Sequence, residues 1–314
     1  MQKLRIIGTK RIKINMNNNS PRATIIGFGA IILWAGLAFL VSFVKNIPAF
    51  QLVAMSFFIT FIIGLITSVI QRKNLFEIAK MPLKIWALGV GGLFGYHFLL
   101  FLAMQNAPVL QASLINYLWP LLIVLFSTLL PKSHGGGRLA WCHIIGALLG
   151  LFGVVLIVTN GSNFAFSSNA IFGHIAAGAA AFVWASYSVL SRLVSHIPTH
   201  AVTLFCLVTA LLASFAHVIF EQTIVPQSLL QWLAILALGI GPVGGAFYLW
   251  DYAMKQGDIK ILGAGAYLTP LLSTLILVGF GISQANSNLW LASIVISAGA
   301  MLAASGVFFA KNKD

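Results

Sequence analysis

The sequence predicts an all-α membrane protein of ten transmembrane helices, arranged as two inverted five-helix repeats around a central cavity. Composition is the first reason. The chain of 314 residues is 60% hydrophobic and only 7% charged, whereas soluble domains carry about 25% charged residues. Its mean hydropathy is +0.98, and apolar runs long enough to cross about 30 Å of hydrocarbon recur ten times. The alternation of apolar and polar residues that is typical of a membrane β-barrel does not occur.

The predicted elements begin with a basic tail at residues 1–23. The tail lacks a small-residue cleavage site after the first apolar run, so we expect the first helix to be retained rather than removed as a signal peptide. Residues 17–21 are typical of a disordered lead-in. The ten spans are predicted at residues 24–44, 49–70, 85–105, 109–131, 139–160, 170–194, 200–220, 229–254, 260–282 and 289–310.

The charge distribution predicts how the chain lies in the membrane. A net charge of +13 would indicate nucleic-acid binding in a soluble protein. With the N-terminus inside, however, 17 of the 18 basic residues fall in cytoplasmic segments and only Lys45 falls outside. This split follows the positive-inside rule and predicts that both termini are cytoplasmic. We therefore expect the lipid bilayer as a partner and no nucleic acid.

An internal repeat at an offset of 150 residues predicts the symmetry of the helices. Under this offset Trp34 falls on Trp184, and the Tyr-Leu-x-Pro run that ends at Pro120 falls on the one that ends at Pro270. The glycines at 89, 91 and 95 fall on those at 239, 241 and 245. Because each copy holds five helices, an odd number, the second copy must enter the membrane from the opposite side. Many secondary transporters are built from such inverted repeats, with the substrate site between the copies.

The two prolines near the middle of their spans, Pro120 and Pro270, mark the first candidate site. Each removes the helical hydrogen bond to the carbonyl four residues earlier, that of Asn116 or Ala266. A freed carbonyl at bilayer depth must line a cavity or find another partner. A simple kink is one interpretation, but the symmetric placement beside aromatic residues favours a hinge that shapes a cavity.

Aromatic and polar residues gather around these prolines and predict the substrate site. Several of the aromatic residues lie one to two turns deeper than the interfacial belt where Tyr and Trp normally collect. The predicted substrate-binding residues are Tyr96, His97, Asn116, Tyr117, Trp119, Trp184, Tyr187 and Tyr267, and Trp34 lies inside the first span. Ordinary helix packing is the alternative for each aromatic residue alone. Together they indicate a pocket that stacks on a flat, apolar group.

Two ionisable residues inside the spans, His97 and Asp251, are candidates for charge coupling, because such residues usually face a cavity. His97 could bind a substrate carboxylate or change protonation at physiological pH, or it could be a neutral histidine tied to a backbone carbonyl. Asp251 either pairs with Lys255 one turn later or binds a substrate amine or a proton. No lysine or arginine lies in the middle of a span, which disfavours phosphates and nucleotides and favours a small zwitterion or an apolar metabolite.

Several motifs resemble the drug/metabolite transporter superfamily. They are Leu-Ile-Asn-Tyr-Leu-Trp-Pro at 114–120, Val-Trp-Ala-Ser-Tyr at 183–187, Tyr-Leu-Trp-Asp-Tyr-Ala-Met-Lys-Gln-Gly at 248–257 and Ala-Tyr-Leu-Thr-Pro at 266–270. The units at 24–160 and 170–310 look like paired EamA domains. The Asn-Tyr-Leu-Trp-Pro string is similar to the YddG-type aromatic amino-acid exporters of bacterial inner membranes.

This resemblance implies a ten-helix basket with a central cavity. The implied cavity residues are Tyr96 and His97 on the third helix, Tyr117 and Trp119 before the fourth-helix proline, and Trp184 on the sixth helix. Asp251 stands where this exporter branch has an asparagine. If Asp251 faces the cavity, the resemblance implies a different substrate charge preference or a different proton coupling.

We therefore predict a secondary transporter that exports small organic metabolites, foremost aromatic or apolar amino acids, by alternating access across a bacterial inner membrane. One copy of the chain is expected to suffice, without metal or cofactor, and proton coupling is left open. Export of cationic drugs or amines is the alternative within the superfamily. A membrane-embedded enzyme or a non-transporting scaffold is the alternative from another class. The lack of metalloprotease, nucleophile-elbow and phosphate-loop motifs disfavours the enzyme.

Overall fold

Every regular element in the described part of the chain is helical. The computed structural model describes residues 20–311 except 137–139, 160–167, 283, 285 and 286. The α-helices are α1 (Pro21–Ala35), α2 (Leu37–Val41), α3 (Ala49–Ile70), α4 (Leu75–Ala79), α5 (Leu83–Val90), α6 (Tyr96–Asn106), α7 (Val109–Asn116), α8 (Trp119–Phe126), α9 (Trp141–Thr159), α10 (Ile171–Leu190), α11 (Val202–Phe220), α12 (Leu229–Ile240), α13 (Ala246–Gln256), α14 (Ile259–Gly265), α15 (Leu268–Gly279) and α16 (Ser287–Lys311). Short 3₁₀ turns are η2 (Ser127–Leu129), η3 (Lys132–His134), η4 (Ser168–Ala170), η5 (Ser191–Val194) and η6 (Thr199–Ala201), and η1 (Gly91–Gly95) and η7 (Gly241–Gly245) are π-helical.

Within these described residues, nine helical stretches are long and apolar enough to cross a membrane. They are Pro21–Val41, Ala49–Ile70, Leu83–Asn106, Gln111–Leu129, Trp141–Thr159, Ile171–Val194, Thr199–Phe220, Leu229–Gln256 and Ile259–Gly279. The helix α16 adds a shorter apolar stretch at Ser287–Ala303. Their order follows the ten predicted spans, which confirms the all-α membrane fold class.

The first helix begins earlier than predicted. It starts at Pro21 rather than at residue 24, because Ser20 caps it: the Ser20 Oγ accepts a hydrogen bond from the backbone N–H of Ala23 at 3.4 Å. The predicted lead-in at 17–21 therefore ends in a helix cap and the first helical residue. The remainder of the predicted tail lies outside the described residues.

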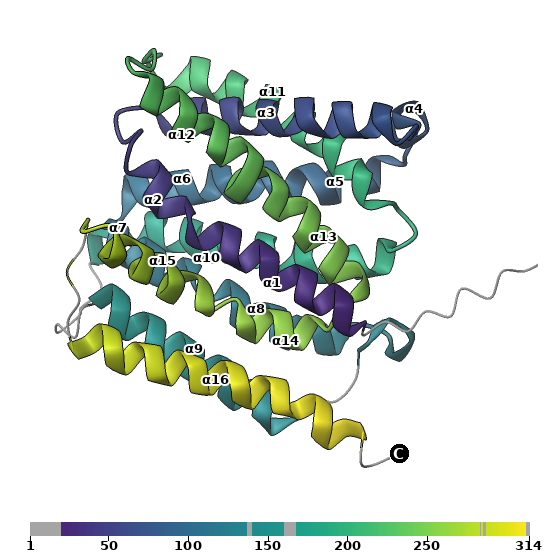
Figure 1. The fold of residues 1–314 in the computed structure, drawn as a ribbon, viewed down its shortest axis with the longest axis vertical. Helices are drawn as coiled ribbons and strands as arrows, with labels where there is room; N and C mark the ends of the chain where they lie inside the picture. The colour runs from purple at the N-terminus through teal and green to yellow at the C-terminus, as the bar shows by residue number, and fades with distance from the viewer. Residues whose placement is uncertain (1–19, 137–139, 160–167, 283, 285–286, 312–314) are drawn as a thin grey trace, which may run out of the picture.

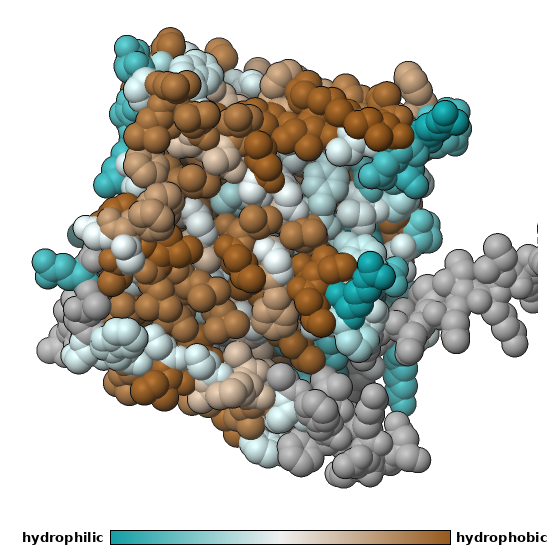
Figure 2. Space-filling model, viewed as in Figure 1, coloured by the Kyte–Doolittle hydropathy of each residue, from teal (hydrophilic) through white to brown (hydrophobic). Residues whose placement is uncertain are grey.

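The helices lie side by side and run between two opposite ends of the molecule (Figure 1). The start of α1 and the end of α16 lie at the same end, which we call the terminal end; the opposite end is the far end. Figure 2 shows hydrophobic residues over the band between the two ends and hydrophilic residues gathered at the ends. A surface of this kind is what hydrocarbon covers in a membrane protein.

Both repeats are interrupted at equivalent places. The π-helical segments η1 and η7 fall in the third and eighth spans, at positions that differ by the repeat offset of 150 residues. The fourth span breaks between α7 and α8, and the ninth breaks between α14 and α15, beside Pro120 and Pro270. The carbonyl of Ala266, freed by Pro270, accepts a hydrogen bond from the N–H of Thr269 at 3.0 Å. The helices are thus interrupted where the prolines predicted an interruption.

The π-helical segments were not predicted, although their glycines define the sequence repeat. Glycine is required at Gly92 because α10 approaches closely there: a Cβ at this position would overlap the ring of Tyr187. A π-helical turn inserts one residue into a helix and redirects the side chains that follow it. In the third span, the first side chains to follow are those of Tyr96 and His97.

The helices α9 and α16 pack against each other at one edge of the molecule through small residues (Figure 1). A Cβ at Gly146 would lie 2.5 Å from the carbonyl oxygen of Gly299, and a Cβ at Gly299 would lie 2.6 Å from the carbonyl oxygen of Gly146. Such close backbone contact needs small residues on both helices and is a common way for transmembrane helices to associate.

We expect Gly146→Ala to destabilise the protein by about 1–3 kcal/mol, because the new methyl group forces the two backbones apart. The measurement is the melting temperature of the purified protein in detergent. Gly279→Ala is the matched control, since a Cβ at Gly279 meets nothing within 4 Å. Equal melting temperatures for the two variants would contradict the close contact between α9 and α16.

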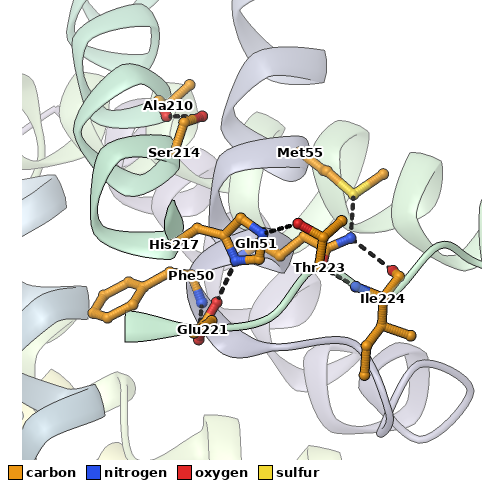
Figure 3. Close-up of polar contacts among 9 residues, drawn as sticks. All are labelled: Phe50, Gln51, Met55, Ala210, Ser214, His217, Glu221, Thr223 and Ile224. Carbon is orange, nitrogen blue, oxygen red and sulfur yellow. Dashed lines mark hydrogen bonds and ion pairs between the residues drawn. The ribbon is translucent and has the colours of Figure 1, made fainter. Parts of the chain in front are cut away.

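At the far end, Glu221 connects the end of α11 to the start of α3 through hydrogen bonds (Figure 3). Its carboxylate accepts hydrogen bonds from the backbone N–H groups of Phe50 at 2.9 Å and of Gln51 at 3.0 Å. The His217 Nδ1 lies 2.8 Å from the same carboxylate. A carboxylate at a helix N-terminus satisfies free N–H groups and matches the helix dipole. The start of α3 is therefore held in place beside the cavity described next.

Candidate functional site

A central cavity of about 400 Å³ lies between the two repeats. Helices of both copies line it, among them α3, α6 and α7 of the first copy and α10, α13 and α15 of the second. On the first span the lining runs from Trp34 to Val41, which is the half next to the far end. Leu37 and Met104 line the cavity and are exposed. The cavity therefore opens toward the far end and stops at the level of Trp34.

Aromatic rings close the deep part of the cavity. The Trp34 ring lies 6.1 Å from Trp119 and 5.8 Å from Trp184, measured between ring centroids, in edge-to-face arrangements. Tyr96 lies 5.3 Å from Trp184, and Phe247 lies 5.6 Å from it. All five rings line the cavity. Rings packed at these distances and angles are mutually favourable and offer both faces and edges to a flat, apolar group.

The cavity also holds a small group of polar side chains. The His97 Nδ1 lies 2.7 Å from the carbonyl oxygen of Leu93, which belongs to η1. Because a carbonyl oxygen only accepts, Nδ1 carries the hydrogen and donates it. The Asn116 Nδ2 donates a hydrogen bond to the Tyr96 hydroxyl at 3.2 Å. The His97 ring is tied to a backbone carbonyl, as the second interpretation from the sequence expected, and it also lines the cavity.

Two predicted substrate-binding residues do not line the cavity. Tyr187 is 3% exposed and packs on Trp184 at 5.4 Å, behind the cavity wall. Tyr267 is fully buried and packs close to Gly150 of α9. Each ring is turned toward a glycine of a neighbouring helix in this conformation, so direct contact with the substrate stays a prediction for both. Tyr117 does line the cavity.

Asp251 forms an ion pair with Lys255 and is absent from the cavity lining. The Lys255 Nζ lies 2.8 Å from the Asp251 carboxylate and also donates to the carbonyl oxygen of Ile197 at 3.0 Å. The Asp251 side chain is 2% exposed and the Lys255 side chain 5%. The structure therefore favours the paired interpretation over a substrate contact. The pair is also buried.

Hydrogen bonds between helices close the terminal end below the cavity. The Arg192 guanidinium donates to the carbonyl oxygen of Gly257, and the backbone N–H of Asp258 donates to the Thr24 hydroxyl at 2.8 Å. Together with the Asp251–Lys255 pair, these contacts join the first, sixth, eighth and ninth spans. Under the repeat offset, Arg192 matches Ser42, Asp251 matches Phe101 and Lys255 matches Gln105. The repeat partners of these three charged residues are thus uncharged.

Comparison with known proteins places the fold and the cavity in a family. The model of the EamA-like transporter family matches residues 21–159 and again residues 171–305. The chain belongs to the EamA-like transporter family.

Relatives of this EamA-like transporter cover nearly its whole length. It is 45% identical over 282 residues to the aromatic amino acid exporter YddG of Ancylobacter novellus, covering 90% of this chain and 96% of the relative. It is 25% identical to the exporter of the same name from Escherichia coli, covering 90% of this chain and 96% of the relative. A solved crystal structure that is 44% identical covers 90% of this chain and 98% of its own, with a TM-score of 0.85.

Two aromatic residues of this EamA-like transporter's cavity were not among the predicted binding residues. Trp34 is the partner of Trp184 under the repeat offset, and Phe247 is the partner of His97. Extending each predicted residue to its repeat partner would have found both. Ser56 and Thr269 also line the cavity. Thr269 precedes Pro270 in the sequence, whereas no sequence signal marks Ser56.

Proposed function

We propose that this EamA-like transporter exports amino acids with aromatic or apolar side chains by alternating access. The observation that carries the proposal is the lining of the cavity: it holds the rings described above and, among the described residues, no Asp, Glu, Lys or Arg. A site without charged side chains suits a molecule of zero net charge. A cavity of about 400 Å³ lies within the usual range of small-molecule sites. A zwitterion with a flat, apolar side chain meets all these conditions.

The names of the relatives support this substrate class. Proteins 45% and 25% identical to this chain, from Ancylobacter novellus and Escherichia coli, are called aromatic amino acid exporters. The cavity residues that the resemblance implies, Tyr96, His97, Tyr117, Trp119 and Trp184, all line the cavity. Membership of a transporter family also supports the expectation that the chain is not an enzyme.

The positive-inside rule supports a cytoplasmic terminal end in a bacterial inner membrane. The far end then faces outward, so the cavity is open to the outside and the contacts at the terminal end form the inner gate. Inverted repeats can exchange their arrangements, which would close the far end and open the terminal end. One chain contains the complete cavity, so a monomer is a sufficient transport unit.

Export of cationic drugs or amines is the second candidate, and an Asp251 side chain that faced the cavity would have favoured it. Asp251 is instead engaged by Lys255, which favours the zwitterion. For any coupling to protons, His97 is the better candidate of the two residues, because it lines the cavity and Asp251 does not.

Counterflow in proteoliposomes tests the proposed function. Vesicles loaded with unlabelled phenylalanine are expected to take up labelled phenylalanine transiently above its external concentration, because an alternating-access carrier exchanges one molecule for another. Uptake should saturate with labelled substrate. Vesicles without protein are the control. Uptake that never exceeds equilibration would indicate a channel, and no uptake would refute aromatic amino acids as substrates.

A further inference from the structure

In the Asn116 amide group, the nitrogen makes a hydrogen bond within the protein and the oxygen makes none. Its Nδ2 donates to the Tyr96 hydroxyl, while its Oδ1 is buried without a hydrogen-bond partner. Asn116 lines the cavity and is 8% exposed. A buried amide oxygen without a partner is costly, and a hydrogen-bond donor brought by a ligand would remove that cost. The orientation of the amide therefore leaves Oδ1 as an acceptor that no described protein group uses.

His97 offers a second acceptor in the same cavity. Since Nδ1 donates to the carbonyl oxygen of Leu93, Nε2 of the neutral ring has no hydrogen and accepts. Among the described residues, Nε2 has no hydrogen-bond partner. Tyr96 joins the two side chains: its hydroxyl accepts from Asn116, and its ring lies 5.2 Å from the His97 ring. Two acceptors thus flank one tyrosine.

The backbone around Asn116 favours positive charge. Asn116 is the last residue of α7, which ends inside the membrane-spanning region. The C-terminal end of a helix carries partial negative charge, and broken helices in transporters use such ends to hold cations. The faces of Trp119 and Trp184 in the same cavity also attract cations. In the second repeat the position that matches Asn116 is Ala266. Only the first repeat therefore has a side-chain amide at this helix end.

We propose that Asn116 and His97 form the subsite that binds the ammonium group of the substrate. The proposal rests on the proposed function and assigns the orientation of an amino acid in the cavity. An ammonium group carries a positive charge and three donors, which match the Asn116 Oδ1 and His97 Nε2 acceptors, whereas a carboxylate would find no donor at either atom. The aromatic side chain then lies among the rings of Trp34, Trp119 and Trp184. Asn116 thereby becomes a specificity residue that separates amino acids from the corresponding hydroxy acids.

The first test compares three compounds on the wild-type protein. L-Phenylalanine carries both charged groups, 2-phenylethylamine lacks the carboxylate, and 3-phenyllactate has a hydroxyl in place of the ammonium group. Binding is measured by the fluorescence of the cavity tryptophans in detergent, and transport by competition in phenylalanine counterflow. We expect phenyllactate to bind at least about tenfold more weakly than phenylalanine, the loss typical of a hydrogen bond to a charged group. Equal binding of phenyllactate and phenylalanine would overturn the proposal.

Two variants assign the effect to Asn116. Asn116→Leu removes one of the two acceptors and should reduce the preference for phenylalanine over phenyllactate by at least about threefold. Asn116→Asp keeps an acceptor and adds negative charge, so binding of phenylethylamine should strengthen by roughly tenfold. Asn106→Leu is the matched control, because Asn106 is exposed and is not part of the cavity lining. A full wild-type preference in Asn116→Leu would refute the assignment, and the Asp variant tests it if the Leu variant does not fold.

The two proposals can fail separately. If phenylalanine shows no counterflow but phenylethylamine binds and phenyllactate does not, the ammonium subsite stands and the proposed substrate class is wrong. If phenylalanine is transported and phenyllactate competes equally, the substrate class stands and the subsite is refuted.

Discussion

Lys255→Met is expected to destabilise the protein by about 3–5 kcal/mol, the usual cost of removing one partner from a buried ion pair. The Asp251 carboxylate, 2% exposed, would lose the ammonium group that lies 2.8 Å away. The carbonyl oxygen of Ile197 would lose its donor as well. The measurement is the melting temperature in detergent, which should fall by several degrees.

Two further variants separate burial of charge from loss of packing. The double variant Asp251→Asn with Lys255→Met removes both charges and should recover most of the lost stability, because no unpaired charge is left. Lys80→Met is the matched control: Lys80 lies 3.8 Å from Glu77, but the two side chains are 74% and 67% exposed. An exposed pair contributes about 0–1 kcal/mol. If Lys255→Met and Lys80→Met behave alike, the pair is not buried as described.

Trp184→Ala is expected to reduce phenylalanine transport at low substrate concentration by at least about tenfold, equivalent to about 1.4 kcal/mol. Trp184 is the central ring of the cavity, within 6.4 Å of Trp34, Tyr96, Trp119 and Phe247. Removing it opens the wall against which the substrate side chain stacks and releases the rings around it. Transport is measured by counterflow, per molecule of folded protein.

The conservative and control variants define what this result means. Trp184→Phe keeps an aromatic ring and should retain more transport than the alanine variant. Trp232→Ala removes a tryptophan of α12 that is 47% exposed and absent from the cavity lining, so its transport should stay within about twofold of wild type. Transport by Trp184→Ala at the level of Trp232→Ala would exclude Trp184 from the site.

Sequence periodicity and the repeat were enough to predict the fold class, and the aromatic and polar residues around the prolines pointed to the cavity, six of whose lining residues were named: Tyr96, His97, Asn116, Tyr117, Trp119 and Trp184. The offset of 150 residues fixed which positions are equivalent, and equivalent positions are interrupted in the same way in both copies. The repeat also predicts Trp34 and Phe247 as cavity residues, because they are the repeat partners of Trp184 and His97. The π-helical segments were beyond prediction, because glycine clusters are compatible with several backbone conformations.

The sequence did not reveal which way several side chains face. Tyr187 and Tyr267 have the depth and chemistry of cavity residues, but each lies against a neighbouring helix that a glycine allows to come close, at Gly92 and at Gly150. Asp251 and Lys255 are one helical turn apart, and only packing decides whether such residues face each other or a cavity. These choices depend on contacts between distant parts of the chain, which one sequence does not reveal.

The neutral lining of the cavity also has an electrical consequence. Moving one net charge through a membrane potential of 100 mV involves about 2.3 kcal/mol of work. A carrier that holds a zwitterion in a cavity without charged side chains moves no net charge through that field. When no proton accompanies the proposed substrates, the voltage across the membrane neither drives nor opposes their export. The difference in amino-acid concentration then sets the direction of net flow, so a cell could release an excess without spending its membrane potential.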